Sequence, residues 1–107
     1  MVDRELLERI VDEILTISDP RKIVLFGSHA RGDAEEDSDL DILIIKESDI
    51  PRHKRSMPFR LKLKGLYPSK DIVVYTPEEV EEWSQVPNAF ITTILREGKV
   101  LYEKGSV

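Results

Sequence analysis

The apolar residues of this chain occur in short runs, none longer than four residues, separated by amphipathic segments and turn residues. The longest runs, Ile23–Phe26, Ile42–Ile45 and Ile72–Tyr75, have the length of short buried strands. In residues 4–17, apolar residues recur instead at helical spacing. A chain of 107 residues is the size of one domain. The pattern predicts a single α/β (α+β) domain over residues 1–107, in which helices cover a small mixed β-sheet.

The expected elements alternate along the chain, and no linker is long enough to divide it into domains. Helices are expected over residues 4–17, 28–32, 59–66, 77–85 and 87–97, and strands over 23–26, 40–46, 72–75 and 100–102. Thr76, Pro77 and Glu79 form the clearest helix start, because they combine a capping side chain, a first-turn proline and a capping box. We expect Asp3 to cap the first helix and Gly98 to end the last one.

Composition excludes several classes of function. The chain has no cysteine, which rules out disulfides, thiolate metal sites and a cysteine nucleophile. Its net charge of −5 argues against direct binding to nucleic acid, whose binders are normally basic. No apolar run approaches the length of a membrane span, and the amino terminus is charged from its third residue, unlike a signal peptide. We therefore expect a cytoplasmic protein that does not bind membranes.

Three carboxylates stand at the start of expected strands. Asp39 and Asp41 are two residues apart, so alternation places both on one face, and Asp71 opens a later strand. If those strands are neighbours, the three carboxylates converge and repel one another, a conflict that bound divalent cations remove. Carboxylate oxygens without His or Cys suit Mg²⁺ or Mn²⁺. Each piece has a simpler alternative: Asp-x-Asp is also a turn or cap feature, and Asp71 beside Lys70 is also consistent with a salt bridge at the strand edge.

Gly27 and Ser28 follow the first strand and precede a short helical turn. Glycine allows the backbone to approach a ligand closely, and the N–H groups at a helix start bind phosphate. The same two residues also suit a plain turn. Beside a carboxylate pair with two metal ions, however, they would suit in-line displacement at phosphorus. Arg31, about one helical turn beyond Ser28, either contacts phosphate or a partner, or forms a salt bridge with a nearby acid.

The segment around these residues resembles the minimal nucleotidyltransferases of the DNA polymerase β superfamily. Their pattern is Gly-Ser-x-Ala-Arg-Gly followed by Ser-Asp-x-Asp-Leu, matched here by residues 27–32 and 38–42 with Ile42 in place of leucine. The resemblance implies a polymerase β-like nucleotidyltransferase fold in which Gly27 and Ser28 hold the β- and γ-phosphates of ATP. It implies that Asp39 and Asp41 bind two Mg²⁺ ions (Mn²⁺ being the alternative). Asp71, the shortest match, would ligate the catalytic metal and help take the proton from the acceptor hydroxyl.

Minimal domains of this family often act with a helical partner of the HEPN type, as the antitoxin of a toxin–antitoxin pair. The resemblance therefore implies a protein adenylyltransferase that moves AMP from ATP to a hydroxyl on a partner protein. The alternative is a non-catalytic subunit that binds a nucleotide, or inhibits the partner by contact alone.

Other residues carry weaker expectations. Leu43, Ile45, Val73 and Tyr75 share a strand face with the carboxylates, so we expect a partner, a second copy or the nucleotide base to cover that apolar face. His29 and the acids Asp33, Glu35, Glu36 and Asp37 are expected at the surface, and Trp83 with Val80 in the core. The basic residues after the second strand are expected to form a solvated face, the alternative being that they guide an anionic nucleotide or an acidic partner: Arg52, Lys54, Arg55, Arg60, Lys62 and Lys64.

Overall fold

A mixed four-stranded sheet forms the centre of the molecule. The computed structural model describes residues 3–35, 37–87 and 89–105, and its strands pair in the order β3-β2-β1-β4. The strands are β1 Lys22–Phe26, β2 Leu40–Ile45, β3 Lys70–Tyr75 and β4 Lys99–Glu103. β2 and β3 run parallel, whereas β1 is antiparallel to β2 and to β4. The expectation of a small mixed sheet in an α/β (α+β) domain is confirmed.

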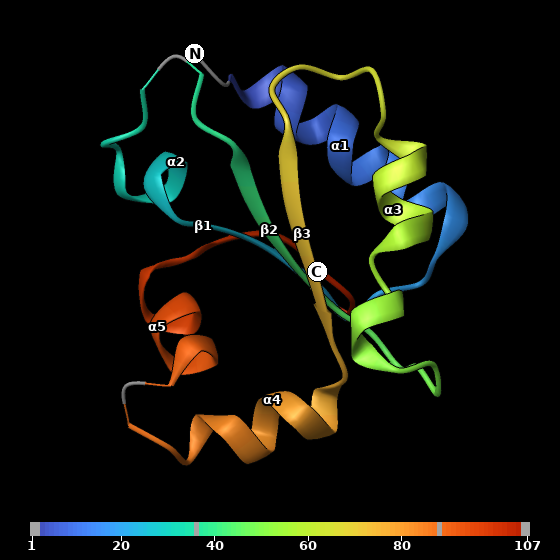
Figure 1. Ribbon diagram of the computed structural model, residues 1–107, viewed down its shortest axis with the longest axis vertical. Helices are drawn as coiled ribbons and strands as arrows, with labels where there is room; N and C mark the ends of the chain where they lie inside the picture. The colour runs from blue at the N-terminus through green and yellow to red at the C-terminus, as the bar shows by residue number, and fades with distance from the viewer. Residues whose placement is uncertain (1–2, 36, 88, 106–107) are drawn as a thin grey trace.

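Helices cover both faces of this sheet (Figure 1). They are α1 Arg4–Ile17, α2 Ser28–Arg31, α3 Met57–Lys62, α4 Pro77–Ser84 and α5 Phe90–Glu97, with a 3-10 turn at Arg52–Lys54. α1 and α3 pack on one face, and α4 and α5 pack on the other. Because successive side chains of a strand point to opposite faces, β1 and β2 supply both cores and are apolar at nearly every position. Among the described residues, no helix is long and apolar enough to cross a membrane.

Side-chain caps define the starts of two helices, as the sequence predicts. Asp3 accepts a hydrogen bond from the Leu6 N–H at 2.9 Å and so begins α1. Thr76 and Glu79 form a reciprocal capping box at the start of α4, with bonds of 3.1 and 2.9 Å. These bonds satisfy N–H groups that the helix itself leaves without partners.

Three helix boundaries differ from the expectation by two residues or more. α3 ends at Lys62 rather than at residue 66, because the chain there leaves the helix for a turn. α3 begins at Met57, two residues before the expected start, because Pro58 lies in its first turn, where a missing N–H costs nothing. α5 begins at Phe90 rather than at the expected residue 87, and Asn88 lies outside the described residues.

The expectation that the apolar face beside the carboxylates needs an external cover is wrong for its centre. Leu43 is 0% exposed and Ile45 is 6% exposed, because Ile91 and Ile94 of α5 pack directly against that face. The chain after β3 folds back over the sheet as α4 and α5, which short-range alternation does not reveal. Only the β3 side of this face remains half-buried.

Two further expectations about burial are corrected. Trp83 is 42% exposed and not a core residue, because Ile91 and Ile94 of the neighbouring helix fill the core at that face. Arg55 is not part of a solvated basic face. It is 9% exposed and donates to the Glu79 carboxylate at 2.6 Å and to the Ile50 carbonyl at 2.8 Å.

Candidate active site

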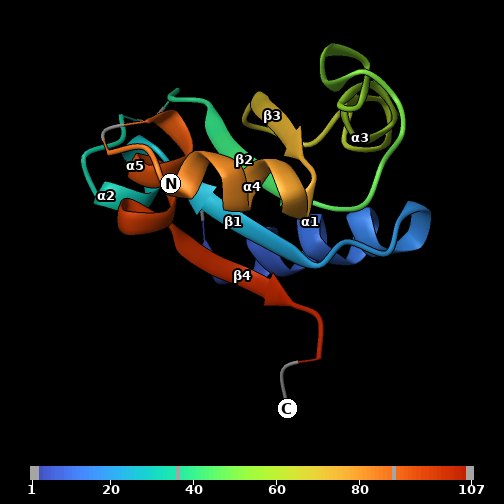
Figure 2. The same cartoon turned by 90° about the horizontal axis from the view of Figure 1, so that it is seen from below.

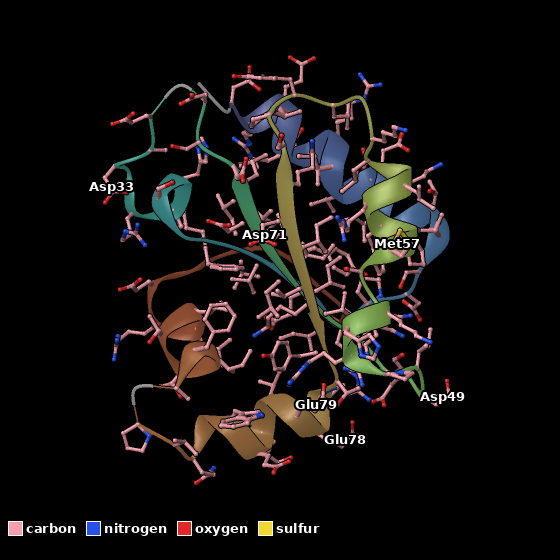
Figure 3. All side chains as sticks on the ribbon, in the orientation of Figure 1. Asp33, Asp49, Met57, Asp71, Glu78 and Glu79 are labelled. Atoms are coloured by element: carbon pink, nitrogen blue, oxygen red, sulfur yellow. The ribbon has the colours of Figure 1, made fainter. Side chains whose placement is uncertain are left out.

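Strand register brings two of the three predicted carboxylates together. In the parallel pairing of β2 with β3, Asp41 lies directly opposite Asp71, and across the other side of β2 it pairs with Phe26 at the end of β1. Asp39 lies one residue before β2 and is exposed. Figure 3 shows Asp71 on β3, toward the end of the strand away from the labelled Glu79. The carboxylates therefore share the edge of the sheet at which β1 ends and β2 and β3 begin.

Gly27 is in close contact with this carboxylate edge. A Cβ atom at Gly27 would lie 2.1 Å from Oδ2 and 2.9 Å from Cγ of Asp41, so no larger residue has room there. The backbone of Gly27 has φ 76° and ψ −155°, a region that is essentially restricted to glycine. The turn from β1 into α2 thus needs glycine twice, for its dihedral angles and for its contact with Asp41. A plain turn explains the first requirement but not the second.

The start of α2 lies next to the same carboxylate. Gly27 caps the helix without a side chain, and its carbonyl accepts from the N–H groups of Ala30 and Arg31 at 3.1 and 3.0 Å. Ser28 is the first helical residue and is half-buried. Backbone N–H groups and a hydroxyl therefore stand beside Asp41, a combination that can accept a phosphate when cations balance the carboxylate charge.

The electrostatics of Asp41 reflect its crowded position. Burial raises the pKa of Asp41 above its ordinary value, and the negative charges of Asp71 and Asp39 raise it further. The positive charges of His29 and Arg31 act in the opposite direction without overcoming these effects. A divalent cation would relieve this like-charge repulsion, so the donor set suits Mg²⁺ or Mn²⁺. Among the described residues, however, no three His, Cys, Asp or Glu side chains already converge as a metal-binding group.

Lys70 does not neutralise Asp71 through the salt bridge considered as an alternative. Its ammonium group donates instead to the carbonyl oxygens of Leu66 and Pro68, the latter at 2.6 Å. Burial lowers the pKa of Lys70. Asp71 therefore adds its negative charge beside Asp41, its partner in the strand register.

Arg31 and His29 are placed by contacts within the chain. The Arg31 guanidinium lies 3.2 Å from the Asp33 carboxylate and 3.8 Å from the Glu97 carboxylate. Of the two alternatives for Arg31, the structure thus contains the salt bridge, and the side chain remains 47% exposed. His29 is half-buried rather than at the surface, and its Nε2 lies 2.9 Å from the carbonyl oxygen of Ser38. His29 therefore ties α2 to the residue just before Asp39, a positioning role that no sequence signal indicated. The described acids of the intervening loop, Asp33, Glu35 and Asp37, are exposed as expected, and Glu36 lies outside the described residues.

A pocket of about 320 Å³ opens beside Gly27, Ser28 and Asp41. Its opposite wall is formed by α5, whose Glu97 lies 3.8 Å from Arg31 of α2. Both helices lie toward the left of the molecule in Figures 1 and 2, although their ribbons are separated in Figure 1. Four residues of α5 line it: Phe90, Thr93, Ile94 and Glu97. Sequence reasoning missed this wall entirely, because only the packing of α5 across the end of β1 brings these residues to the site.

Comparisons with known proteins match most of the length of the chain. The family described as nucleotidyltransferase domain matches residues 7–102. A Methanocaldococcus jannaschii protein named "Putative protein adenylyltransferase MJ0604" is 38% identical over 84 residues, covering 77% of this chain and 78% of the relative. "Putative protein adenylyltransferase MJ0141" of the same organism is 33% identical over 76 residues, covering 68% and 74%.

Two solved structures share the fold. One is titled a "putative nucleotidyltransferase from Sulfolobus solfataricus"; it has a TM-score of 0.66 and 20% identity, and the match covers 94% of this chain and 79% of that one. The other is titled "toxin-antitoxin with AMP-PNP"; it has a TM-score of 0.61 and 20% identity, and the match covers 92% and 74%. The family match spans nearly the whole chain and includes every residue of the site just described. This chain belongs to the nucleotidyltransferase domain family.

Proposed function

We propose that this chain transfers AMP from ATP to a hydroxyl group on a partner protein, with divalent cations held by Asp39, Asp41 and Asp71. The observation that carries the proposal is the contact between Gly27 and Asp41, with Asp71 opposite Asp41 in register. It brings a phosphate-binding turn and two carboxylates into one site. A general nucleotide-binding turn needs the glycine but has no need for two carboxylates beside it.

Each residue has a distinct role in the proposed site. The backbone N–H groups at Gly27 and Ser28, with the Ser28 hydroxyl, bind and orient the β- and γ-phosphates. Arg31 forms ion pairs with Asp33 and Glu97, but its side chain is still 47% exposed. Its proposed role is to contact a phosphate from the same turn. Asp39, Asp41 and Asp71 would supply carboxylate oxygens to the cations.

The proposed chemistry is one displacement at the α-phosphorus. The acceptor oxygen forms a bond to that phosphorus, the bond to the bridging β-phosphate oxygen breaks, and pyrophosphate leaves. Asp71 accepts the hydroxyl proton. Bound Mg²⁺ supplies charge neutralisation for the phosphates and lowers the pKa of the attacking hydroxyl.

The acceptor class and partner are supported by what similar proteins are named. Two relatives carry names that say protein adenylyltransferase. The toxin–antitoxin structure that shares the fold was determined with AMP-PNP. We propose by analogy that this chain is the antitoxin of such a pair, acting on a helical HEPN-type protein.

Labelled ATP tests the proposal. The chain is incubated with ATP labelled at the α-phosphate, Mg²⁺ and a HEPN-type protein encoded beside it. We expect label on the partner, no label when EDTA removes the metal, and at least about 100-fold less label with Asp39→Asn. Asp37→Asn is the matched control, because Asp37 is an exposed acid of the loop outside the proposed ligand set. A stable complex without label from ATP would instead indicate a contact-only or nucleotide-binding subunit.

A further inference from the structure

The pocket between α2 and α5 has an apolar wall beside the proposed phosphate site. Phe26 and Phe90 meet edge to face, with ring centroids 5.7 Å apart and planes at 87°. Phe26 is 9% exposed, but Phe90 is 54% exposed although it lines the pocket. The Phe26 ring thus packs against one side of the Phe90 ring, and more than half of Phe90 remains exposed. Phe90 therefore presents a large, flat apolar surface where it lines the pocket.

The charges of the pocket oppose a phosphate in its apolar part. Glu97 and Asp41 contribute carboxylates to the lining, and Arg31 is the lining residue that carries a positive charge. Arg31 is already paired with Asp33 and with Glu97. The triphosphate therefore belongs at the carboxylate edge, with its cations, and the region along Phe90 suits an uncharged, flat group.

The size of the pocket agrees with such a group. Its volume of about 320 Å³ is at the lower end of small-molecule sites, which suits a nucleoside rather than a larger ligand. The same pocket includes Gly27 and Ser28, so one molecule can reach both regions. Base–aromatic stacking is favourable for every nucleobase, because each has a flat π face.

We propose that this pocket binds the base of the nucleoside triphosphate and that Phe90 is the surface on which the base stacks. The proposal rests on the proposed function, because it assigns the other end of the same substrate. It makes Phe90 a substrate-binding residue that acts on nucleotide affinity while leaving the phosphate and metal contacts unchanged.

Paired ligands separate base binding from phosphate binding. The affinities of ATP and inorganic tripolyphosphate, each with Mg²⁺, are measured by calorimetry for the wild type, Phe90→Ala and Leu95→Ala. We expect Phe90→Ala to weaken ATP binding about tenfold, as loss of one stacked base does, and to leave tripolyphosphate binding unchanged. Leu95→Ala is the matched control, because Leu95 is a 38% exposed apolar residue of the same helix outside the pocket lining. It should change neither affinity.

Each contrary outcome has a distinct meaning. Unchanged ATP affinity in Phe90→Ala, with the wild type binding both ligands, overturns the base subsite but leaves the proposed function standing. Equal losses of ATP and tripolyphosphate affinity also overturn it, because Phe90 would then act by shaping the site. Failure of the wild type to bind either ligand contradicts the proposed function and the subsite together. Circular dichroism of each variant shows that the fold is retained.

Discussion

At the scale of single residues, the geometry of the site depends most on Gly27. Its dihedral angles and its contact with the Asp41 carboxylate both require the absence of a Cβ atom. Gly32, five residues farther on, also has a positive φ, of 88°, but a Cβ there would meet nothing within 4 Å. The two glycines therefore separate backbone strain from steric contact with the site.

Substitution of each glycine by alanine makes that distinction measurable. Gly27→Ala should lose about 1–3 kcal/mol of unfolding free energy to backbone strain and at least about 100-fold in AMP transfer, because Asp41 is displaced. Gly32→Ala should lose about 1–2 kcal/mol and keep its transfer activity. Urea unfolding and label transfer measure the two effects. Full activity in Gly27→Ala would show that the close contact has no part in catalysis.

A second residue-scale prediction concerns the ion pair of Glu79 with Arg55. Burial acts to raise the pKa of Glu79, but hydrogen bonds from Arg55 and from the Thr76 N–H, with the charges of Arg55 and Arg52, outweigh it and lower the pKa. A lowered pKa in the folded state stabilises the fold above the pKa of an unfolded glutamate, about 4.3. That stabilisation is lost as the pH falls through the lower pKa of the folded state.

Glu79→Gln should therefore be less stable than the wild type by about 2 kcal/mol at neutral pH. The difference should shrink as the pH falls below about 4.3. Chemical unfolding across a pH series measures it. Glu78→Gln is the matched control, because Glu78 is exposed on the same helical turn; it should change stability by only a few tenths of a kcal/mol. A difference for Glu79→Gln that does not vary with pH would contradict the pKa assignment.

At the scale of elements, the placement of α5 decides what the site contains. The helix ends at Gly98, whose N–H donates to the Ile94 carbonyl at 2.7 Å before the chain enters β4. A Cβ at Gly98 would lie 2.5 Å from a methyl carbon of Val24 and 2.6 Å from the Ile94 carbonyl oxygen. The φ of Gly98 is −75°, so this glycine serves close packing of α5 and β4 against β1.

Gly98→Ala should consequently destabilise the fold by about 1–3 kcal/mol through overpacking, although alanine can adopt its backbone angles. Thermal and urea unfolding measure this loss. Val24→Ala removes part of the steric conflict. The double variant Gly98→Ala, Val24→Ala should therefore lose less unfolding free energy than the sum of the losses of the two single variants. Wild-type stability in the single variant would contradict the close packing described here.

Prediction from sequence succeeded for elements that local patterns define. The apolar runs gave the four strands to within two residues, and caps located the starts of α1 and α4. Packing across elements was not predictable. Nothing local to Phe90 or Glu97 indicates that α5 covers the end of β1, and nothing near Trp83 indicates that its side chain remains 42% exposed. The same limit explains why Arg55 was expected in a solvated face, since its partner Glu79 lies 24 residues away.

At the scale of the whole molecule, two cores on opposite faces share the same strands. Ile44 and Leu43 are adjacent on β2 and both are 0% exposed, but they belong to different cores. Neither core exists without β1 and β2, so the two faces should unfold together. The site draws on both, since Asp41 is the second residue of β2, the strand that both cores share, and α5 packs in the second core.

Alanine substitutions on the two faces test this cooperativity. Ile44→Ala and Leu43→Ala should each cost about 2–5 kcal/mol. Each should shift the midpoint seen by far-ultraviolet circular dichroism and that seen by Trp83 fluorescence by the same amount, although Trp83 lies on the α4 side only. Separate midpoints for the two probes would show that the faces unfold independently.

The carboxylate edge is the part of the whole molecule on which the account depends, and one measurement tests it most directly. The chain, Mg²⁺ and its partner are incubated in parallel with ATP labelled at the α-phosphate and ATP labelled at the γ-phosphate. The account predicts that only the α-label reaches the partner, and that Asp71→Asn abolishes this transfer while the complex still forms. Transfer of the γ-label, or equal α-label transfer by Asp71→Asn, would contradict it.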